Sequence, residues 1–143
     1  AMYQGYASDM TRTFPVSGTF SEREREIYEI VRNAQQAAIE ACHAGVTFRE
    51  LDRIARRVIE EAGYGDAYTH SLGHHVGLEV HDPHVEDLEE KMVITIEPGI
   101  YLPEESIGVR IEDTFVVEEK ACRAITHFPT EPDAVEAAMR LDP

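Results

Sequence analysis

Two Ser/Thr-x-x-Glu patterns, at residues 21–24 (SERE) and 47–50 (TFRE), constrain the fold of this chain most strongly. In such a capping box, the hydroxyl and the Glu carboxylate satisfy free backbone N–H groups at the start of a helix. Apolar residues recur at helical spacing after each box, which predicts two helices ending at Gly45 and Gly63. We interpret these apolar stripes as core: Ile27, Ile30, Val31, Ala34, Ala37, Ala38 and Ala41, then Leu51, Ile54, Ala55, Val58, Ile59 and Ala62.

Short segments of strand character flank these helices. The first, residues 6–14, alternates two sets of side chains, with Met10, Arg12 and Phe14 on one face and Asp9, Thr11 and Thr13 on the other. Further strands are expected at residues 92–97, 109–117 and 122–126, and a last helix at 134–141 with Pro132 in its first turn. A strand, two helices and then several strands predict an α+β fold.

Composition narrows the possible partners and location. The chain has 143 residues, the size of one domain, and its 13 basic and 28 acidic residues give a net charge of −15. That charge argues against nucleic acid as a partner, and the longest stretch without charged residues, 67–78, is too short to span a membrane. Cys42 and Cys122 lack metal-type spacing, and no signal peptide is visible. We therefore expect buried thiols in a reducing cytoplasm.

Chemistry-bearing residues gather in four places. Residues 63–143 hold 18 acids and 5 bases, and five of the seven histidines lie between His70 and His84. Acids and histidines together are typical of sites for hard or borderline metal ions. Each motif is weak alone, because acidic turns and Gly-His loops are common. The four, in this order, are much more specific: SDMTRT from Ser8, GHHVGLEVHD from Gly73, IEPG from Ile96 and RIED from Arg110.

With these motifs, residues 3–129 resemble the catalytic domain of the pita-bread metallopeptidases, which include methionine aminopeptidase, proline aminopeptidase and prolidase. The matching strings are YASDMTRTF, GHHVGLEVHD, TIEPGIY and GVRIEDTF. The resemblance implies the C-terminal portion of a pita-bread domain, an antiparallel sheet packed with helices. Methionine aminopeptidases tend to have His where this chain has Asp113. The closer resemblance is therefore to the Xaa-Pro aminopeptidase and Xaa-Pro dipeptidase branch, whose substrates are short peptides with proline at the second position.

The resemblance also implies a role for each matching residue. Asp9 and Glu112 would bridge two divalent metal ions, while His74 and Glu97 would bind the second. Manganese is the expected metal, with cobalt, zinc and iron also suited to such ligands. Glu97 would also act as general base. The supporting residues would be His70 and His81 at the substrate carbonyl and oxyanion, and Arg110 bracing the Asp9 or Glu112 carboxylate.

The sequence also departs from the family pattern. A fifth metal ligand, an Asp eleven positions before Asp9, would fall before Ala1, so residues 1–143 are expected to form one N-terminally incomplete catalytic domain. We then expect at most one well-bound metal, weak activity in isolation, and self-association as a homodimer through a bare sheet edge or helix face. Lys91 stands where the family usually has a turn glycine, and Ala121 stands near another, so these departures concern only the geometry of those turns.

Other interpretations remain open. Histidines without a matched role are read as surface or local hydrogen-bonding residues: His43, His75, His84 and His127. The chain could be a non-catalytic pita-bread binding or scaffold module, an interpretation that the missing metal ligand favours. It could also be a methionine aminopeptidase-like enzyme. The least favoured reading is an unrelated acidic α+β domain with coincidental motifs.

Overall fold

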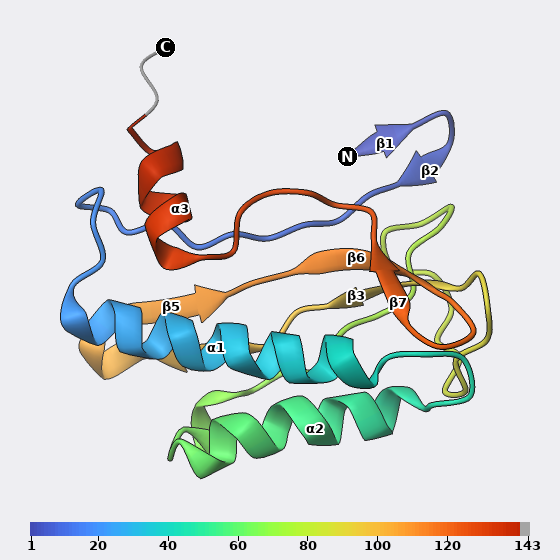
Figure 1. Cartoon of the computed structure of the whole chain (residues 1–143), viewed down its shortest axis with the longest axis horizontal. Coiled ribbons are helices and arrows are strands. Elements are labelled where there is room, and N and C mark those ends of the chain that lie inside the picture. The colour runs from blue at the N-terminus through green and yellow to red at the C-terminus, as the bar shows by residue number, and fades with distance from the viewer. Residues whose placement is uncertain (141–143) are drawn as a thin grey trace.

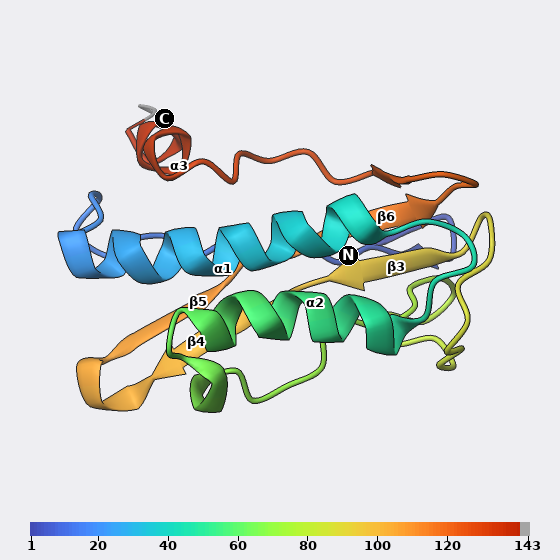
Figure 2. The same ribbon diagram turned by 60° about the horizontal axis from the view of Figure 1, so that its bottom comes forward.

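Two long helices form one layer and the strands another, with a short C-terminal helix apart from the long pair, as the computed structural model, which describes residues 1–140, shows (Figures 1 and 2). The helices are α1 (Glu22–Ala41), α2 (Phe48–Glu61) and α3 (Pro132–Ala138), with single 3₁₀ turns at Gly65–Ala67 and Pro103–Glu105. The strands are β1 (Met2–Tyr3), β2 (Tyr6–Ala7), β3 (Val93–Ile96), β4 (Gly99–Leu102), β5 (Ile107–Arg110), β6 (Asp113–Val117) and β7 (Cys122–Ala124). Every strand pair is antiparallel, in the orders β1-β2, β3-β6-β7 and β4-β5.

Both capping boxes form as predicted. The Ser21 hydroxyl accepts the Glu24 N–H and the Glu24 carboxylate accepts the Ser21 N–H, and the second box repeats this pattern. Gly63 follows the end of α2 with a φ of +91°, as expected of a helix-terminating glycine. The predicted end of the first helix at Gly45 was wrong. Helix α1 stops at Ala41 because Cys42 already adopts extended backbone.

The apolar stripes of α1 and α2 form the core against the strands. Ile27 and Val31 on α1 and Leu51 and Ile59 on α2 are fully buried in one cluster, which includes Ile94 of β3. Burying a side chain of this size contributes about 1.5–3 kcal/mol relative to leaving it exposed. One predicted core position, Ala62, is exposed instead, since it lies beyond the last turn of α2.

A long hairpin runs through the middle of the molecule, and both of its arms are interrupted. The predicted strand over 109–117 is two strands, β5 and β6, and residues 99–102, for which no strand was predicted, form β4. The register is the same on both sides of the gap, with Ile96 opposite Asp113 and Gly99 opposite Arg110. Glu97 therefore lies opposite Glu112 where the ladder stops.

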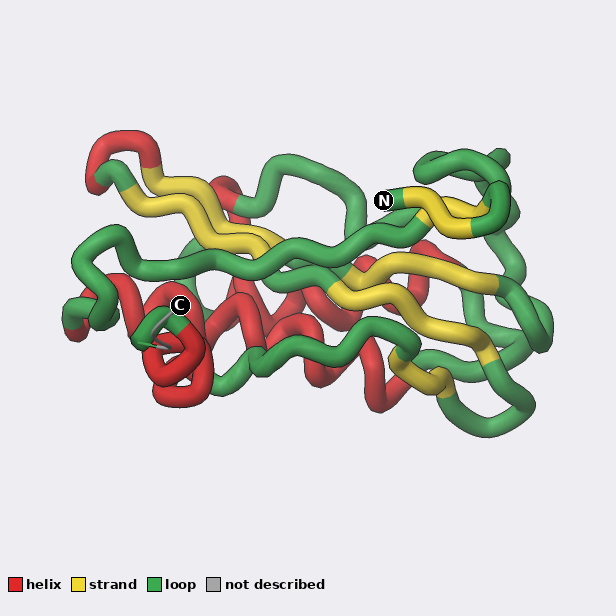
Figure 3. The backbone as a smooth tube through the Cα atoms, turned by 90° about the horizontal axis from the view of Figure 1, so that it is seen from above, coloured by secondary structure: helices red, strands yellow, loops and turns green. Residues whose placement is uncertain are grey.

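The predicted strand over residues 6–14 was mostly wrong. Only β2 is a strand, and the rest runs extended along the sheet (Figure 3) with one isolated backbone pair, Thr11 to Glu112. Side chains replace the missing ladder, since the Thr13 hydroxyl accepts the Arg110 N–H and donates to the Arg110 carbonyl. The β1–β2 hairpin was not predicted. Its two turn residues, Gln4 and Gly5, have φ of +50° and +87°.

The two glycine-replacing residues behave differently. Lys91 has a φ of +73°, a left-handed conformation that glycine adopts without steric penalty. Ala121 is absent from the positive-φ residues of the described chain, so its turn does not require glycine. The last helix begins at Pro132 as expected and ends at Ala138, while Leu141 lies outside the described residues. Within residues 1–140, no helix combines the length and apolar character needed to cross a membrane.

Candidate metal centre

The interrupted hairpin directs two acids to one place. Pro98 has no N–H to donate to the facing arm of the hairpin. The Glu97 N–H points to the opposite edge, where it donates to the Leu72 carbonyl at 2.7 Å. The Glu112 N–H donates to the Thr11 carbonyl at 3.0 Å. Both glutamates thus point their N–H groups away from each other and toward neighbouring segments, as a non-hydrogen-bonded pair of an antiparallel hairpin does. Glu112 is 2% exposed, so its carboxylate is buried at the junction.

His74 reaches the same junction because the chain approaches β3 very closely there. A Cβ on Gly73 would lie 2.1 Å from the Thr95 carbonyl oxygen, so only glycine fits. The His74 N–H donates to the Thr95 hydroxyl, and its Nδ1–H donates to the His75 carbonyl at 3.0 Å. That bond leaves Nε2 free to face acids, 3.3 Å from Glu97 and 3.6 Å from Asp9.

The arrangement fits a divalent cation. Asp9, His74 and Glu112 each offer a ligand atom, and these atoms lie within 4.8 Å of one another. One Glu112 oxygen accepts from the Thr11 hydroxyl, whereas the other, Oε1, is buried without a hydrogen-bond partner. Buried polar atoms are normally satisfied, and two carboxylates with an imidazole are suitable ligands for such ions. Glu97 lies beside these three residues, with its carboxylate 3.3 Å from His74 Nε2.

Electrostatics point the same way. Burial, with the nearby Glu97 and Asp9 charges, raises the pKa of Glu112 to about 7, against the opposing hydrogen bond from Thr11. Burial acts to raise the pKa of Glu97, but the His74 hydrogen bond and charge outweigh it and lower that pKa. For His74, burial is likewise outweighed, and Glu97 raises its pKa. Without a cation, gathering these acids is unfavourable.

The remaining predicted site residues surround this group. The His81 ring centroid lies 4.2 Å from that of His74. His70 donates from Nδ1 to the Ser71 carbonyl, so its Nε2 accepts the Tyr101 hydroxyl at 2.9 Å. Sequence reasoning missed Tyr101, which follows the IEPG motif by two positions.

Arg110 is placed differently from the expectation. Its Nε lies 3.4 Å from the Thr11 hydroxyl and 3.8 Å from Glu97, and it also hydrogen-bonds Tyr101. Its support of Glu112 therefore runs through Thr11, which donates to that carboxylate. The period-two pattern that puts Thr11 on the Asp9 face was the available signal for this role.

Arg12 was missed as a site-building residue, although it lies within the first motif. Its side chain is 3% exposed and all five N–H donors find acceptors. Four bonds go to backbone carbonyls and one to the buried Asp113 carboxylate at 2.7 Å. The carbonyls belong to Thr11, Glu112, Phe128 and Pro129.

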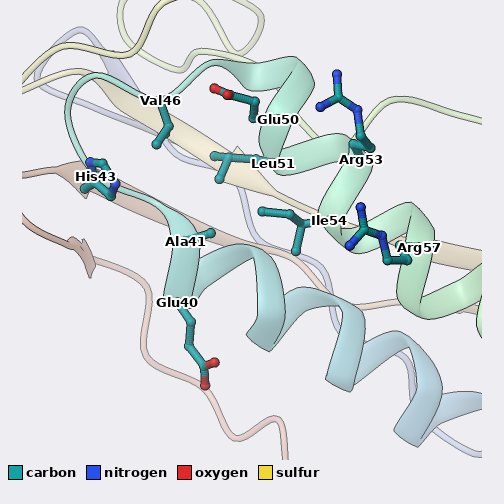
Figure 4. Close-up of a pocket in the computed structure, with 9 residues that line it drawn as sticks. All are labelled: Glu40, Ala41, His43, Val46, Glu50, Leu51, Arg53, Ile54 and Arg57. Atoms are coloured by element: carbon teal, nitrogen blue, oxygen red, sulfur yellow. The ribbon is translucent and has the colours of Figure 1, made fainter.

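The other histidines differ in their surroundings. His75 is not on the surface: it is 7% exposed, packs edge-on to Phe48 and hydrogen-bonds the Val85 carbonyl. His43 bonds locally to the Ala44 carbonyl. A hollow of about 360 Å³ beside His43, between the end of α1 and the start of α2, contains none of the predicted site residues in its lining (Figure 4).

Comparison with known proteins identifies the family. Residues 1–119 match the sequence profile described as Metallopeptidase family M24. The chain belongs to this family. Over 132 residues it is 53% identical to an Xaa-Pro dipeptidase of Pyrococcus furiosus and 50% identical to one of Lactobacillus helveticus. These matches cover 88% of this chain and only 37% and 35% of those proteins.

Solved structures of M24 relatives agree. An X-Pro aminopeptidase from Thermotoga maritima has a TM-score of 0.87 at 42% identity, over 92% of this chain and 38% of that one. A prolidase from Pyrococcus horikoshii has a TM-score of 0.85 at 51% identity, over 91% and 39%. The predicted α+β fold, the C-terminal portion of a pita-bread domain, is confirmed. This chain spans a little over a third of the length of these relatives.

Replacing Arg12 by Lys should destabilise the protein strongly. Lysine offers three donors instead of five and cannot reach the same spread of acceptors, so buried carbonyls lose partners. We expect the free energy of unfolding in urea to fall by about 2–4 kcal/mol. Arg57→Lys, at an exposed position on α2, should change it by less than about 0.5 kcal/mol. Equal effects of the two substitutions would contradict the stabilising role of the five Arg12 hydrogen bonds.

In metal-free protein, Glu112→Gln should become increasingly stabilising as pH rises. The Glu112 carboxyl of the wild type has a raised pKa in the folded state. Its contribution to stability is therefore fully present below the unfolded-state pKa near 4.5 and is lost as pH rises through about 7. Between pH 4 and 8, the wild type should lose up to about 3 kcal/mol relative to the variant. Urea unfolding in chelator checks this, with exposed Glu104→Gln as control. A pH-independent difference would contradict it.

Proposed function

We propose that this chain carries the metal-binding part of an Xaa-Pro peptidase, a metallo-exopeptidase that hydrolyses the bond preceding proline. The observation that carries the proposal is the meeting of Asp9, His74 and Glu112, with Glu97 alongside, around a buried carboxylate oxygen that lacks a partner. The identity to Xaa-Pro dipeptidases of other organisms supports the substrate class.

Four residues would hold the metal: Asp9, His74, Glu97 and Glu112. Manganese is the proposed ion, and a divalent cation there would supply Lewis-acid chemistry and ease deprotonation of water at neutral pH. Glu97, kept ionised by His74, would accept the water proton as general base.

Three further residues would handle the substrate and hold the ligands. His70 and His81 would hydrogen-bond the substrate carbonyl and the developing oxyanion. His81 lies beside His74, and His70 is oriented by Tyr101. Arg110 would position Thr11 and Glu97.

The extent of the site leads to further proposals. With four of the family's five ligand positions present, we propose that the 143 residues form an N-terminally incomplete catalytic domain with one well-filled metal position and weak peptidase activity alone. We also propose a cytoplasmic homodimer. A non-catalytic scaffold role is the second candidate.

Titration with manganese should reveal one tight site. Calorimetry on the chelator-treated chain is expected to give about one equivalent, because only one metal position has a full set of ligands. His74→Ala and Asp9→Asn should abolish the binding, whereas Glu86→Gln, an acid outside the centre, should leave it unchanged. Two tight equivalents would contradict the single site, and no binding would contradict the metal centre.

A peptidase assay should separate the candidate functions. Manganese-loaded protein is expected to cleave an Ala-Pro dipeptide slowly, with the activity lost in Glu97→Gln and no cleavage of a Met-Ala-Ser peptide. Cleavage of the methionyl peptide would favour a methionine aminopeptidase-like enzyme. Metal binding without any cleavage would favour the scaffold role, and rapid cleavage would refute the proposed weakness of the isolated chain.

A further inference from the structure

The two cysteines, 80 positions apart in the sequence, meet at the end of α1. Cys42 is the C-cap of this helix and Cys122 begins β7, which lies beside that end of α1 (Figures 1 and 3). Both contact one carbonyl, that of Ile39: the Cys42 N–H donates to it at 3.1 Å, and the Cys122 thiol lies 3.7 Å away. Both thiols are free, and they lie near enough for each to shift the pKa of the other.

Their exposure is unequal. Cys42 is 1% exposed and belongs to the hydrophobic core. Cys122 is half-buried and lines a hollow of about 420 Å³ between α1, the β6–β7 pair and the segment before α3. A dissolved reagent can therefore reach Cys122 through the hollow, whereas Cys42 is outside its lining and almost inaccessible.

Their reactivity is unequal in the same sense. The interaction with Cys42 lowers the pKa of Cys122, although burial opposes this. The same interaction, together with burial, raises the pKa of Cys42. Because the thiolate is the nucleophile in disulfide exchange, Cys122 is the residue that reacts first.

We propose that Cys122 and Cys42 form a reversible thiol-modification site, in which Cys122 reacts with oxidised glutathione and Cys42 then converts the adduct into an internal disulfide. The Cys122 thiolate attacks one sulfur of oxidised glutathione, the glutathione S–S bond breaks, and one glutathione leaves as thiolate. Cys42 attacks the Cys122 sulfur, the bond between Cys122 and glutathione breaks, and the leaving glutathione thiolate takes up the Cys42 proton. Two protein thiols are oxidised, and one oxidised glutathione is reduced to two thiols.

The internal bond would join the end of α1 to β7. A cross-link between residues so far apart in sequence restricts the unfolded chain strongly, so the oxidised protein melts at a higher temperature than the reduced one. Neither cysteine belongs to the candidate metal centre of Asp9, His74 and Glu112, and we expect manganese binding to be unchanged by oxidation.

Mass spectrometry of the folded chain after incubation with oxidised glutathione tests the site. The wild type is expected to lose two hydrogen atoms and to keep no glutathione. Cys42→Ser should retain one glutathione on Cys122, and Cys122→Ser should remain unmodified. A stable adduct on the wild type, an adduct on Cys42, or no reaction in the folded chain would each overturn the proposal.

Thermal unfolding by circular dichroism provides the second measurement. The oxidised wild type should melt above the reduced protein, and dithiothreitol should reverse the shift, while both single variants show no shift. The variants' own spectra establish that they are folded, and Cys42→Ala replaces Cys42→Ser if the buried hydroxyl prevents folding. A disulfide between two chains on a non-reducing gel, or no change in melting temperature, would overturn the internal bond.

Discussion

The Arg12 guanidinium holds the candidate site together. The extended segment that carries Asp9 has almost no strand ladder. It pairs with Glu112 at Thr11, and the Thr114 hydroxyl donates to the Asp9 carbonyl. Arg12 compensates by binding three separate parts of the chain: its own segment, the stretch at Glu112 and Asp113, and the loop before α3. Because a buried guanidinium left without acceptors is very unfavourable, the three parts must assemble together.

The hairpin interruption sets the chemistry within that frame. Glu97 and Glu112 face each other as a non-hydrogen-bonded pair of the antiparallel ladder, in which the N–H groups point outward and the facing side chains lie close together. Here each donates its N–H elsewhere, and both carboxylates converge on His74 and Asp9. The result is a buried Glu112 with an unpartnered oxygen, which lowers the stability of the metal-free fold. Such local electrostatic destabilisation is typical of functional sites.

Local patterns in the sequence predicted what local interactions determine. The capping boxes and apolar stripes of α1 and α2 depend on residues three or four apart, and both helices formed. The motifs also identified three acids and one histidine that meet in space, namely Asp9, Glu97, Glu112 and His74. The division of residues 109–117 could not be predicted in this way, since its β-propensity is uniform and the break lies opposite Pro98 of the other arm, which has no N–H to donate. The five-acceptor role of Arg12 is equally non-local.

This non-local construction couples metal binding to folding. The ligands come from the first segment, the glycine-rich loop and the interrupted hairpin, and only tertiary contacts bring them together. A cation held by Asp9, His74 and Glu112 would therefore bind the folded chain, because the unfolded chain has no equivalent site. Its binding free energy would add to stability and offset the burial and the neighbouring acid charges that raise the pKa of Glu112. The candidate centre thus depends on Arg12 for its assembly, and a cation would supply its charge balance.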